Sequence, residues 1–246
     1  GLSSRYLTAA GNGAAYSIAD QEMVVAIGTN AGAHSSGCNN AVFVGGNAGY
    51  TAKESEESTM VGNKAGHAVT GCDYSTMIGS WAGLEALYCN NTNIIGRQAG
   101  NGATENNYTN IIGYKAGYDS IGCDYANMIG YAAGTGMADC NYVDVMGYQA
   151  GSQASGVSYS IFLGYQAGQG AKSFDGINHS YANMIGYQAG VGTTGTNHTN
   201  MIGYWAGYQS MSCDQSEMMG SNAGRYALDC DGSQMIGAYA GNQASG

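Results

Sequence analysis

The chain has 246 residues, of which 42 are Gly and none is Pro, and its formal net charge is −10. Lys and Arg together number only 7, too few for the clustered positive charge of a nucleic-acid-binding surface. No stretch of about 18 apolar residues is present, so we expect no transmembrane helix. The glycine content disfavours ordinary helical domains, because glycine costs about 1 kcal/mol per helical position.

One repeat, Ile-Gly-x-x-Ala-Gly with variants, runs through the whole chain. Its first Gly, called position 0 below, recurs every 17 residues from Gly28 to Gly164 and again from Gly186 to Gly237. In chain order, we expect a degenerate first coil at 1–17, regular coils over 18–168, a five-residue insertion within 169–177, and regular coils over 178–246. The sequence therefore predicts a single repeat domain.

The length of the repeat predicts an all-β fold. A helix pair needs more than about 30 residues per repeat, whereas two short strands and two turns fit within 17. The segments before position 0 are rich in β-branched and apolar residues, and the glycines suit turns. We predict a β-solenoid or β-roll of about fourteen 17-residue coils, with two short parallel strands per coil and a coil spacing of about 4.8 Å.

The residue before position 0 is apolar in every full copy, and we assign it to the core. The predicted core ladder consists of Ile78, Ile95, Ile112, Ile129, Ile185 and Ile202. The Ala at position +3 fits a thin interior. Asn is frequent at position −3, where we expect an inward amide ladder that hydrogen bonds from coil to coil.

The segment 183–190, Asn-Met-Ile-Gly-Tyr-Gln-Ala-Gly, resembles the tandem repeats of phage tail-fibre-like proteins and related bacterial surface proteins. Its Ile-Gly-x-x-Ala core is also similar to the head repeat of trimeric autotransporter adhesins. The resemblance covers about residues 11–246. It implies a β-roll, often trimeric, in an extended attachment fibre.

All seven cysteines lie at position −7, and six of them fall in three pairs of adjacent coils: Cys72 with Cys89, Cys123 with Cys140, and Cys213 with Cys230. Coils about 4.8 Å apart bring paired Cα atoms within disulfide range. Two interpretations therefore remain: disulfides between adjacent coils, or free thiols that fill a small, half-apolar position. No Cys-x-x-Cys is present and the histidines are scattered, so we predict no metal site and no cofactor.

Other ladders are candidates for contact. A Tyr follows position 0 in the middle and late coils, at Tyr114, Tyr131, Tyr148, Tyr165, Tyr187 and Tyr204. A second Tyr ladder lies at position −5, and phenols on a rigid scaffold can stack or bind sugars and proteins. Position −6 is an Asn/Asp row, for which we favour turn chemistry over calcium or polysaccharide binding. The insertion supplies a candidate contact loop with Lys172, Phe174 and Asp175.

These features favour a non-enzymatic structural fibre protein located outside the cell, on a cell surface or on a virion. Nothing in the sequence matches a catalytic motif. The expected partner is the chain itself, as a homopolymer or homotrimer, because bare solenoid ends are templates for end-to-end stacking. A surface polysaccharide or receptor is a further expected partner, and nucleic acid is not. The alternative is an ice-binding or carbohydrate-binding β-solenoid.

Overall fold

The computed structural model describes residues 6–172, 181–195, 200–207, 210–211, 217–224, 226–228, 234–238 and 240–241. Every element in this part of the chain is a β-strand, and the strands are parallel. The chain divides into two compact units, Gly1–Ser120 and Ile121–Gly246, each built from the same coil. The predicted β-solenoid built from a 17-residue repeat is confirmed.

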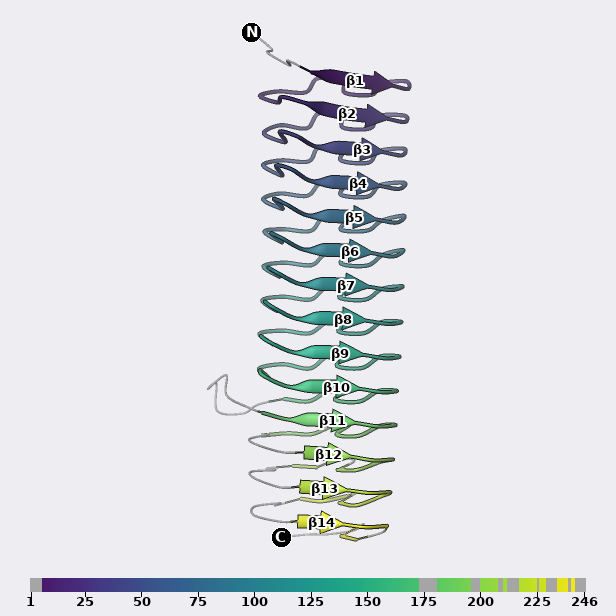
Figure 1. The fold of residues 1–246 in the computed structure, drawn as a ribbon, viewed down its shortest axis with the longest axis vertical. Coiled ribbons are helices and arrows are strands. Elements are labelled where there is room, and N and C mark those ends of the chain that lie inside the picture. The colour runs from purple at the N-terminus through teal and green to yellow at the C-terminus, as the bar shows by residue number, and fades with distance from the viewer. Residues whose placement is uncertain are drawn as a thin grey trace. The chain divides into compact units, whose positions relative to one another are not determined.

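The first unit contains one strand per coil, and each strand pairs with the next in chain order (Figure 1). The pairing joins residues 17 positions apart, as in Thr59↔Thr76 and Thr76↔Asn93. The strands are β1 (Leu7–Ala10), β2 (Val24–Ile27), β3 (Val42–Val44), β4 (Thr59–Val61), β5 (Thr76–Ile78), β6 (Asn93–Ile95) and β7 (Asn110–Ile112).

The second unit repeats this arrangement in its described residues. Its strands are β8 (Asn127–Ile129), β9 (Asp144–Met146), β10 (Ile161–Leu163), β11 (Asn183–Ile185), β12 (Asn200–Ile202), β13 (Glu217–Met219) and β14 (Gln234–Ile236). The strand register is the same on both sides of the insertion, because Phe162 pairs with Met184, which lies 22 residues later at the same position of the next coil. The five-residue insertion therefore changes the sequence distance between paired residues but not the alignment of the strands.

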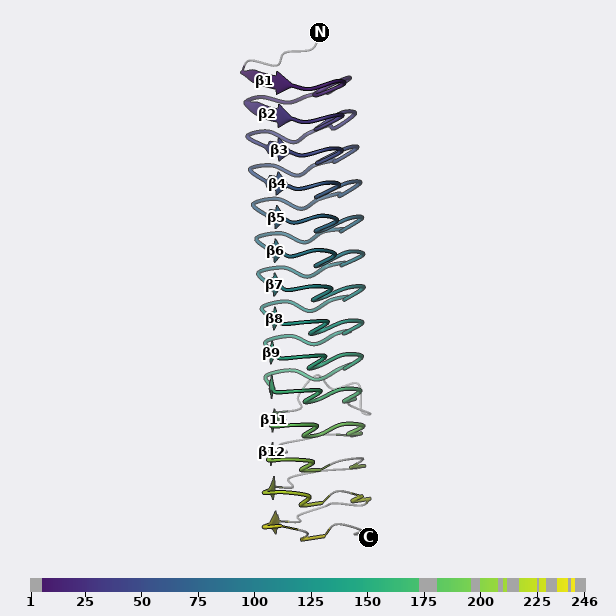
Figure 2. The same ribbon diagram turned by 90° about the vertical axis from the view of Figure 1, so that its right-hand side faces the viewer.

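Each described coil contains one strand, whereas the sequence predicted two. Figure 2 shows the strands of each unit along one side of the coils, with looped segments returning on the other side. The expected second strand is reduced to a single bridging residue at position +8, as in Ser36↔Lys53 and Lys53↔Thr70. Between these points the backbone turns repeatedly through the left-handed region, at Asn30, His34 and many equivalent positions, which leaves no room for a second extended segment.

The core of each unit is a narrow column of side chains stacked coil upon coil. Most of its large members lie at position −2, where Phe43, Met60 and Met77 are fully buried. Small residues fill most of the remaining interior, including the invariant Ala at position +3, such as Ala48 and Ala65. Identical positions stack because every coil has the same length, so a small core motif suffices for each coil.

The predicted core ladder at position −1 is wrong. Ile78, Ile95, Ile112 and Ile202 are exposed, and Ile129 and Ile185 are half-buried. The reason is the alternation of side chains along a strand, which lets a three-residue strand direct only its middle residue inward. Position −2 takes that place, and position −3 faces outward with position −1. The Asn ladder at −3 is therefore also on the outside, contrary to the inward orientation expected.

The glycines at positions 0 and +4 are fixed by close contacts. At Gly79 the backbone has φ +133°, and a Cβ atom would lie 2.5 Å from the carbonyl oxygen of Gly96 in the next coil. At Gly32, with φ +61°, a Cβ atom would lie 2.6 Å from the buried ring of Phe43. Both positions combine a left-handed conformation with close packing, which only Gly satisfies.

Candidate functional site

Two ladders of tyrosines flank the outer face of the strands in the second unit. Position +1 holds one ladder and position −5 holds the other, while positions −3 and −1 of the strands lie between them. The described tyrosines of the +1 ladder in this unit are Tyr131, Tyr148, Tyr165, Tyr187 and Tyr204, and those of the −5 ladder are Tyr125, Tyr142, Tyr159 and Tyr181. All nine are exposed, by 39 to 48% of their surface. We call this surface the tyrosine face.

The rings within each ladder stack on one another. Ring centroids in the +1 ladder are 4.9 Å apart for Tyr131–Tyr148 and for Tyr148–Tyr165, with interplanar angles of 6° and 3°. The −5 ladder gives 4.9 Å for Tyr125–Tyr142 and for Tyr142–Tyr159. These separations equal the spacing of paired strands, about 4.7–4.9 Å. The sheet therefore sets the ring spacing, and stacking of this kind contributes about 0.5–1.5 kcal/mol per pair.

The stacking decides which atoms of each ring are available to a partner. Tyr148 has Tyr131 against one ring face and Tyr165 against the other. Its exposed surface is therefore mainly the ring edge and the phenol. A ladder of this kind presents edges and hydroxyls at regular intervals, whereas flat ring faces, which sugar stacking uses, are covered by the neighbouring rings. The last described tyrosine at position +1, Tyr204, stacks on Trp205 as well as on Tyr187.

An apolar column and an amide column lie between the two tyrosine ladders. The apolar column lies at position −1, where Met146, Leu163 and Ile202 are exposed, and Ile161 adds an exposed apolar side chain to the amide column at position −3. Polar side chains on the same face bond from coil to coil, since the Asn127 amide donates to Asp144 at 2.6 Å and the Asn183 amide donates to Asn200 at 3.0 Å. Exposed apolar residues grouped in this way mark an interaction surface more often than scattered ones.

Tyr114, the +1 tyrosine of the first unit, has a different environment. Its ring is half-buried and lies under two cations, with the Arg97 guanidinium 5.8 Å and the Lys115 ammonium 5.6 Å from the centroid. The earlier full coils of this unit hold Thr29, Gly46, Asn63, Ser80 and Arg97 at position +1. The stacked +1 tyrosine ladder is therefore a property of the second unit, whereas position −5 carries exposed tyrosines in the first unit too, at Tyr74 and Tyr108.

The cysteines are interior residues. Cys38, Cys72, Cys89, Cys123 and Cys140 are fully buried and are present as thiols. They form the same bond as a serine at this position, since the Cys38 thiol donates to the Ser36 carbonyl at 3.4 Å and the Ser55 hydroxyl donates to the Lys53 carbonyl at 2.9 Å. This supports the filler interpretation. Cys213 and Cys230, the third pair proposed for a disulfide, lie outside the described residues.

Burial and side-chain hydrogen bonds change the acidity of these thiols. Burial raises the pKa of Cys38 from 9.0 to about 11. A side-chain hydrogen bond with Cys89, together with burial, raises the pKa of Cys72 further. Since the thiolate is the reactive form of cysteine, Cys38 and Cys72 are poorly placed for nucleophilic chemistry. A side-chain hydrogen bond with Cys123 instead lowers the pKa of Cys140.

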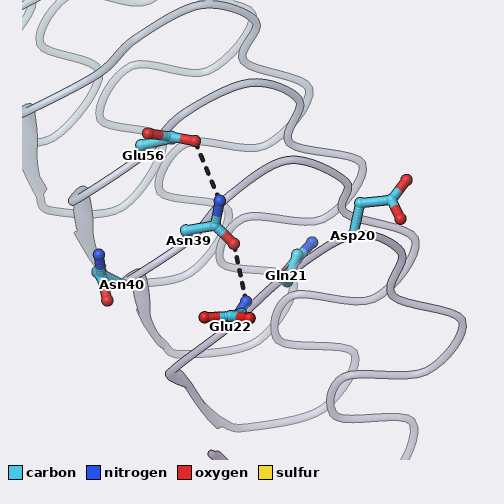
Figure 3. A pocket seen from close by; sticks show the side chains of 6 residues that line it. All are labelled: Asp20, Gln21, Glu22, Asn39, Asn40 and Glu56. Atoms are coloured by element: carbon cyan, nitrogen blue, oxygen red, sulfur yellow. Dashed lines mark hydrogen bonds between the residues drawn. The ribbon is translucent and has the colours of Figure 1, made fainter. Parts of the chain in front are cut away.

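A shallow polar depression lies on the first unit, lined by Asp20, Gln21, Glu22, Asn39, Asn40 and Glu56. Figure 3 shows Asn39 between the two glutamates, with Asp20 pointing away from them. The Asn39 oxygen accepts from the Glu22 backbone N–H at 2.8 Å, and its amide donates to Glu56 at 3.0 Å. The −6 row continues this pattern at Asp73, whose N–H donates to Asn90 at 2.8 Å. This supports a structural, hydrogen-bonding role for the row, as favoured from sequence.

The insertion loop is described only in part. Lys172 bridges both Ser155 and Thr194, so it belongs to the regular coil rather than to a protruding loop. Phe174 and Asp175 lie outside the described residues.

Comparisons with known proteins add nothing to this picture, because no protein-family model matches the chain and no curated protein matches it. Within the described ranges, no three His, Cys, Asp or Glu residues are grouped so that they could hold a metal ion. Those ranges also contain no helix with the length and apolar character needed to cross a bilayer.

Proposed function

We propose that the chain is a non-enzymatic structural fibre protein, and that its tyrosine face mediates lateral association between copies or attachment to a surface. The observation that carries the proposal is the combination, on one side of the second unit, of two stacked tyrosine ladders and an exposed apolar column. The resemblance of the repeat to those of tail-fibre-like and bacterial surface proteins supports the same role and an extracellular, cell-surface or virion location.

A second copy of the chain is the partner that fits this face best. Two such faces carry the same axial repeat, so contacts made at one rung recur at every rung without accumulating mismatch. The face holds little charge in its described residues, the carboxylates of Asp144 and Glu217 being its charged groups. A chain with a net charge of −10 associates with itself most readily through the part of its surface that carries the least charge.

The carbohydrate-binding and ice-binding alternatives fit the face less well. Sugar rings stack on the faces of aromatic rings, and those faces are covered by neighbouring tyrosines along the ladders. A regular outward Thr column would support ice binding, but position −3 holds Thr only at Thr8, Thr59 and Thr76.

The test is to place one charge on the tyrosine face. In Leu163→Lys the ammonium replaces a side chain that is 42% exposed in the apolar column, and burying it at an interface without a partner costs several kcal/mol. The matched control is Ile121→Lys, which is 50% exposed at position +8, where other coils naturally carry Lys53 and Lys172.

Sedimentation velocity and negative-stain electron microscopy of the purified full chain then distinguish the outcomes. We expect laterally associated fibres for the unmodified chain and for Ile121→Lys. For Leu163→Lys we expect a dissociation constant at least tenfold higher. An unmodified chain that stays unassociated at every concentration contradicts lateral association, as does equal weakening by both substitutions.

A further inference from the structure

Charges are unevenly distributed around the coils of the first unit. Every Asp and Glu of residues 1–120 lies at position +6, +9, −6 or −5 of a coil. Positions −3 to +5 of the full coils in this unit contain no carboxylate, and they hold three cations, at Lys64, Arg97 and Lys115. One half of each coil is therefore free of acidic residues, in a chain whose net charge is −10.

The three cations lie beside aromatic rings. The Lys64 ammonium is 5.8 Å from the ring centroid of Trp81, which occupies the same position of the next coil. The Arg97 guanidinium is 5.8 Å from the ring centroid of Tyr114, again one coil later. The Lys115 ammonium is 5.6 Å from that same centroid. The negative ring face of Tyr114 thus attracts two cations and keeps them close together.

The charge of Lys64 also acts on His67, a half-buried side chain at position +5 of the same coil. Burial lowers the pKa of His67, and the Lys64 ammonium lowers it further. The Glu85 carboxylate raises this pKa, but by less than Lys64 lowers it. The order of these effects indicates that the local potential is positive, despite the acidic composition of the chain.

We infer that Lys64, Arg97 and Lys115 form a binding strip for an anionic polysaccharide, a sugar polymer that carries carboxylates or sulfates. Lys64 and Lys115 occupy the same position three coils apart, so their backbones are separated by about 14 Å along the stack of coils. An extended polymer that lies along this stack meets one cation after another. Asn63 and Ser80, at position +1, place polar side chains beside the cations, where sugar hydroxyls can form hydrogen bonds.

An anionic polysaccharide fits this strip better than a nucleic acid does. Double-stranded DNA carries one charge per about 1.7 Å of its length, so the acidic remainder of the chain would repel it strongly while only three cations attract it. A sugar polymer with one acidic group on every sugar or every second sugar is charged more sparsely. The strip lies in the first unit and includes no residue of the tyrosine face, so this inference goes beyond the proposed lateral association.

The experiment measures binding of the full chain to immobilised dextran sulfate and to immobilised alginate, with uncharged dextran as the blank. The two polymers carry sulfates and carboxylates respectively, so they distinguish the two sources of negative charge. We expect binding to at least one of them at about 0.05 M sodium chloride, and binding at least about tenfold weaker at about 0.5 M, because salt ions compete with the ion pairs.

The double variant Arg97→Ser/Lys115→Gln removes two cations of the strip. It introduces residue types that occur naturally at the same positions of neighbouring coils, as Ser80 at +1 and Gln98 at +2. We expect its affinity for the bound polymer to fall at least about tenfold. Lys64→Gln, a separate substitution at the other end of the strip, should weaken binding severalfold by itself.

The matched control is Lys53→Ser/Lys172→Ser, which also removes two cations. Both lysines lie at position +8, outside the strip, where Ser36 and Ser155 occur naturally. We expect this variant to bind as the unmodified chain does. No binding to either polymer, equal weakening by the two double variants, or equally tight binding of single-stranded DNA would each overturn the inference. None of these substitutions lies on the tyrosine face, so lateral association should persist in every variant, and either proposal can fail alone.

Discussion

At the scale of single residues, position 0 shows how coil stacking constrains the backbone. Gly79 has φ +133° and lies against the Gly96 carbonyl, whereas Gly37, with φ +63°, leaves 3.6 Å between an added Cβ and the backbone of Glu54. The residues equivalent to Gly37 in other coils include Glu54 and Tyr88, which adopt the same left-handed conformation. The two glycines therefore differ in packing as well as in φ.

We predict that Gly79→Ala lowers the free energy of unfolding by at least about 3 kcal/mol, because strain and overlap with a backbone oxygen add together. Gly37→Ala should cost about 1 kcal/mol, the ordinary penalty of Ala in the left-handed region. Urea denaturation followed by circular dichroism measures both. Equal losses in the two variants would mean that the close approach at position 0 is unimportant.

The buried thiol of Cys38 predicts a dependence of stability on pH. Its pKa is about 11 in the folded chain against an ordinary 9.0. The folded state therefore holds this proton more tightly, and its contribution to stability is complete below pH 9 and is lost as pH rises toward 11. The size of the loss is about 2–3 kcal/mol.

Cys38→Ser provides the comparison, since Ser55 occupies the equivalent position naturally and does not titrate in this range. The quantity that matters is the difference between the two proteins, because it removes the contribution of every group that they share. We expect the unmodified chain to lose more stability between pH 9 and pH 11 than Cys38→Ser does. Parallel curves would show that burial does not perturb this thiol.

At the scale of the strand, β5 offers a direct comparison of inward and outward positions. Met77 is fully buried and Ile78 is 40% exposed. We predict that Met77→Ala destabilises the fold by about 2–5 kcal/mol, through lost burial and a residual cavity. Ile78→Ala should cost less than about 1 kcal/mol. The urea midpoints of the two variants measure both losses of stability. A larger loss for Ile78→Ala would support the core ladder at position −1 that the sequence predicted.

The sequence contained the information needed to orient these strands. Positions −2 and −1 are both apolar in nearly every coil, so hydrophobicity alone does not separate them. The residue at −3, often polar as in Asn93, Asn110 and Asn127, shares a face with −1 by the two-residue period of a strand. A polar −3 therefore places −1 outside and −2 inside. The predicted core ladder was wrong because it treated a position that is apolar in every full coil as buried.

Other features of the strands and ladders could be predicted because they follow from register. Coils of constant length place Tyr131, Tyr148 and Tyr165 in one row, and the strand spacing fixes their separation. The absence of a second strand could not be predicted, because it depends on the run of residues in the left-handed conformation at positions such as Asn30 and His34. Those residue types tolerate that conformation without requiring it.

At the scale of the whole molecule, stability within each unit comes from contacts between neighbouring coils. Backbone N–H groups donate to the preceding coil, as Gly96 does to Ile78 at 2.8 Å, or to the following one, as Gly83 does to Ala99 at 2.9 Å. Few of these bonds join distant coils, so the free energy is close to a sum over adjacent pairs. A regular outer surface is the consequence, and it is the surface on which the proposed association depends.

The net charge of −10 makes that association sensitive to salt. Copies of an acidic chain repel one another over a distance set by the Debye length, about 10 Å at 0.1 M and about 3 Å at 1 M ionic strength. The tyrosine face would contribute mainly apolar and aromatic contacts, which salt does not weaken. We therefore predict that raising sodium chloride from about 0.05 M to about 0.5 M strengthens lateral association severalfold, as measured by sedimentation velocity. Association that weakens over this range would point to ion pairs between copies, and hence to an interface elsewhere than the tyrosine face.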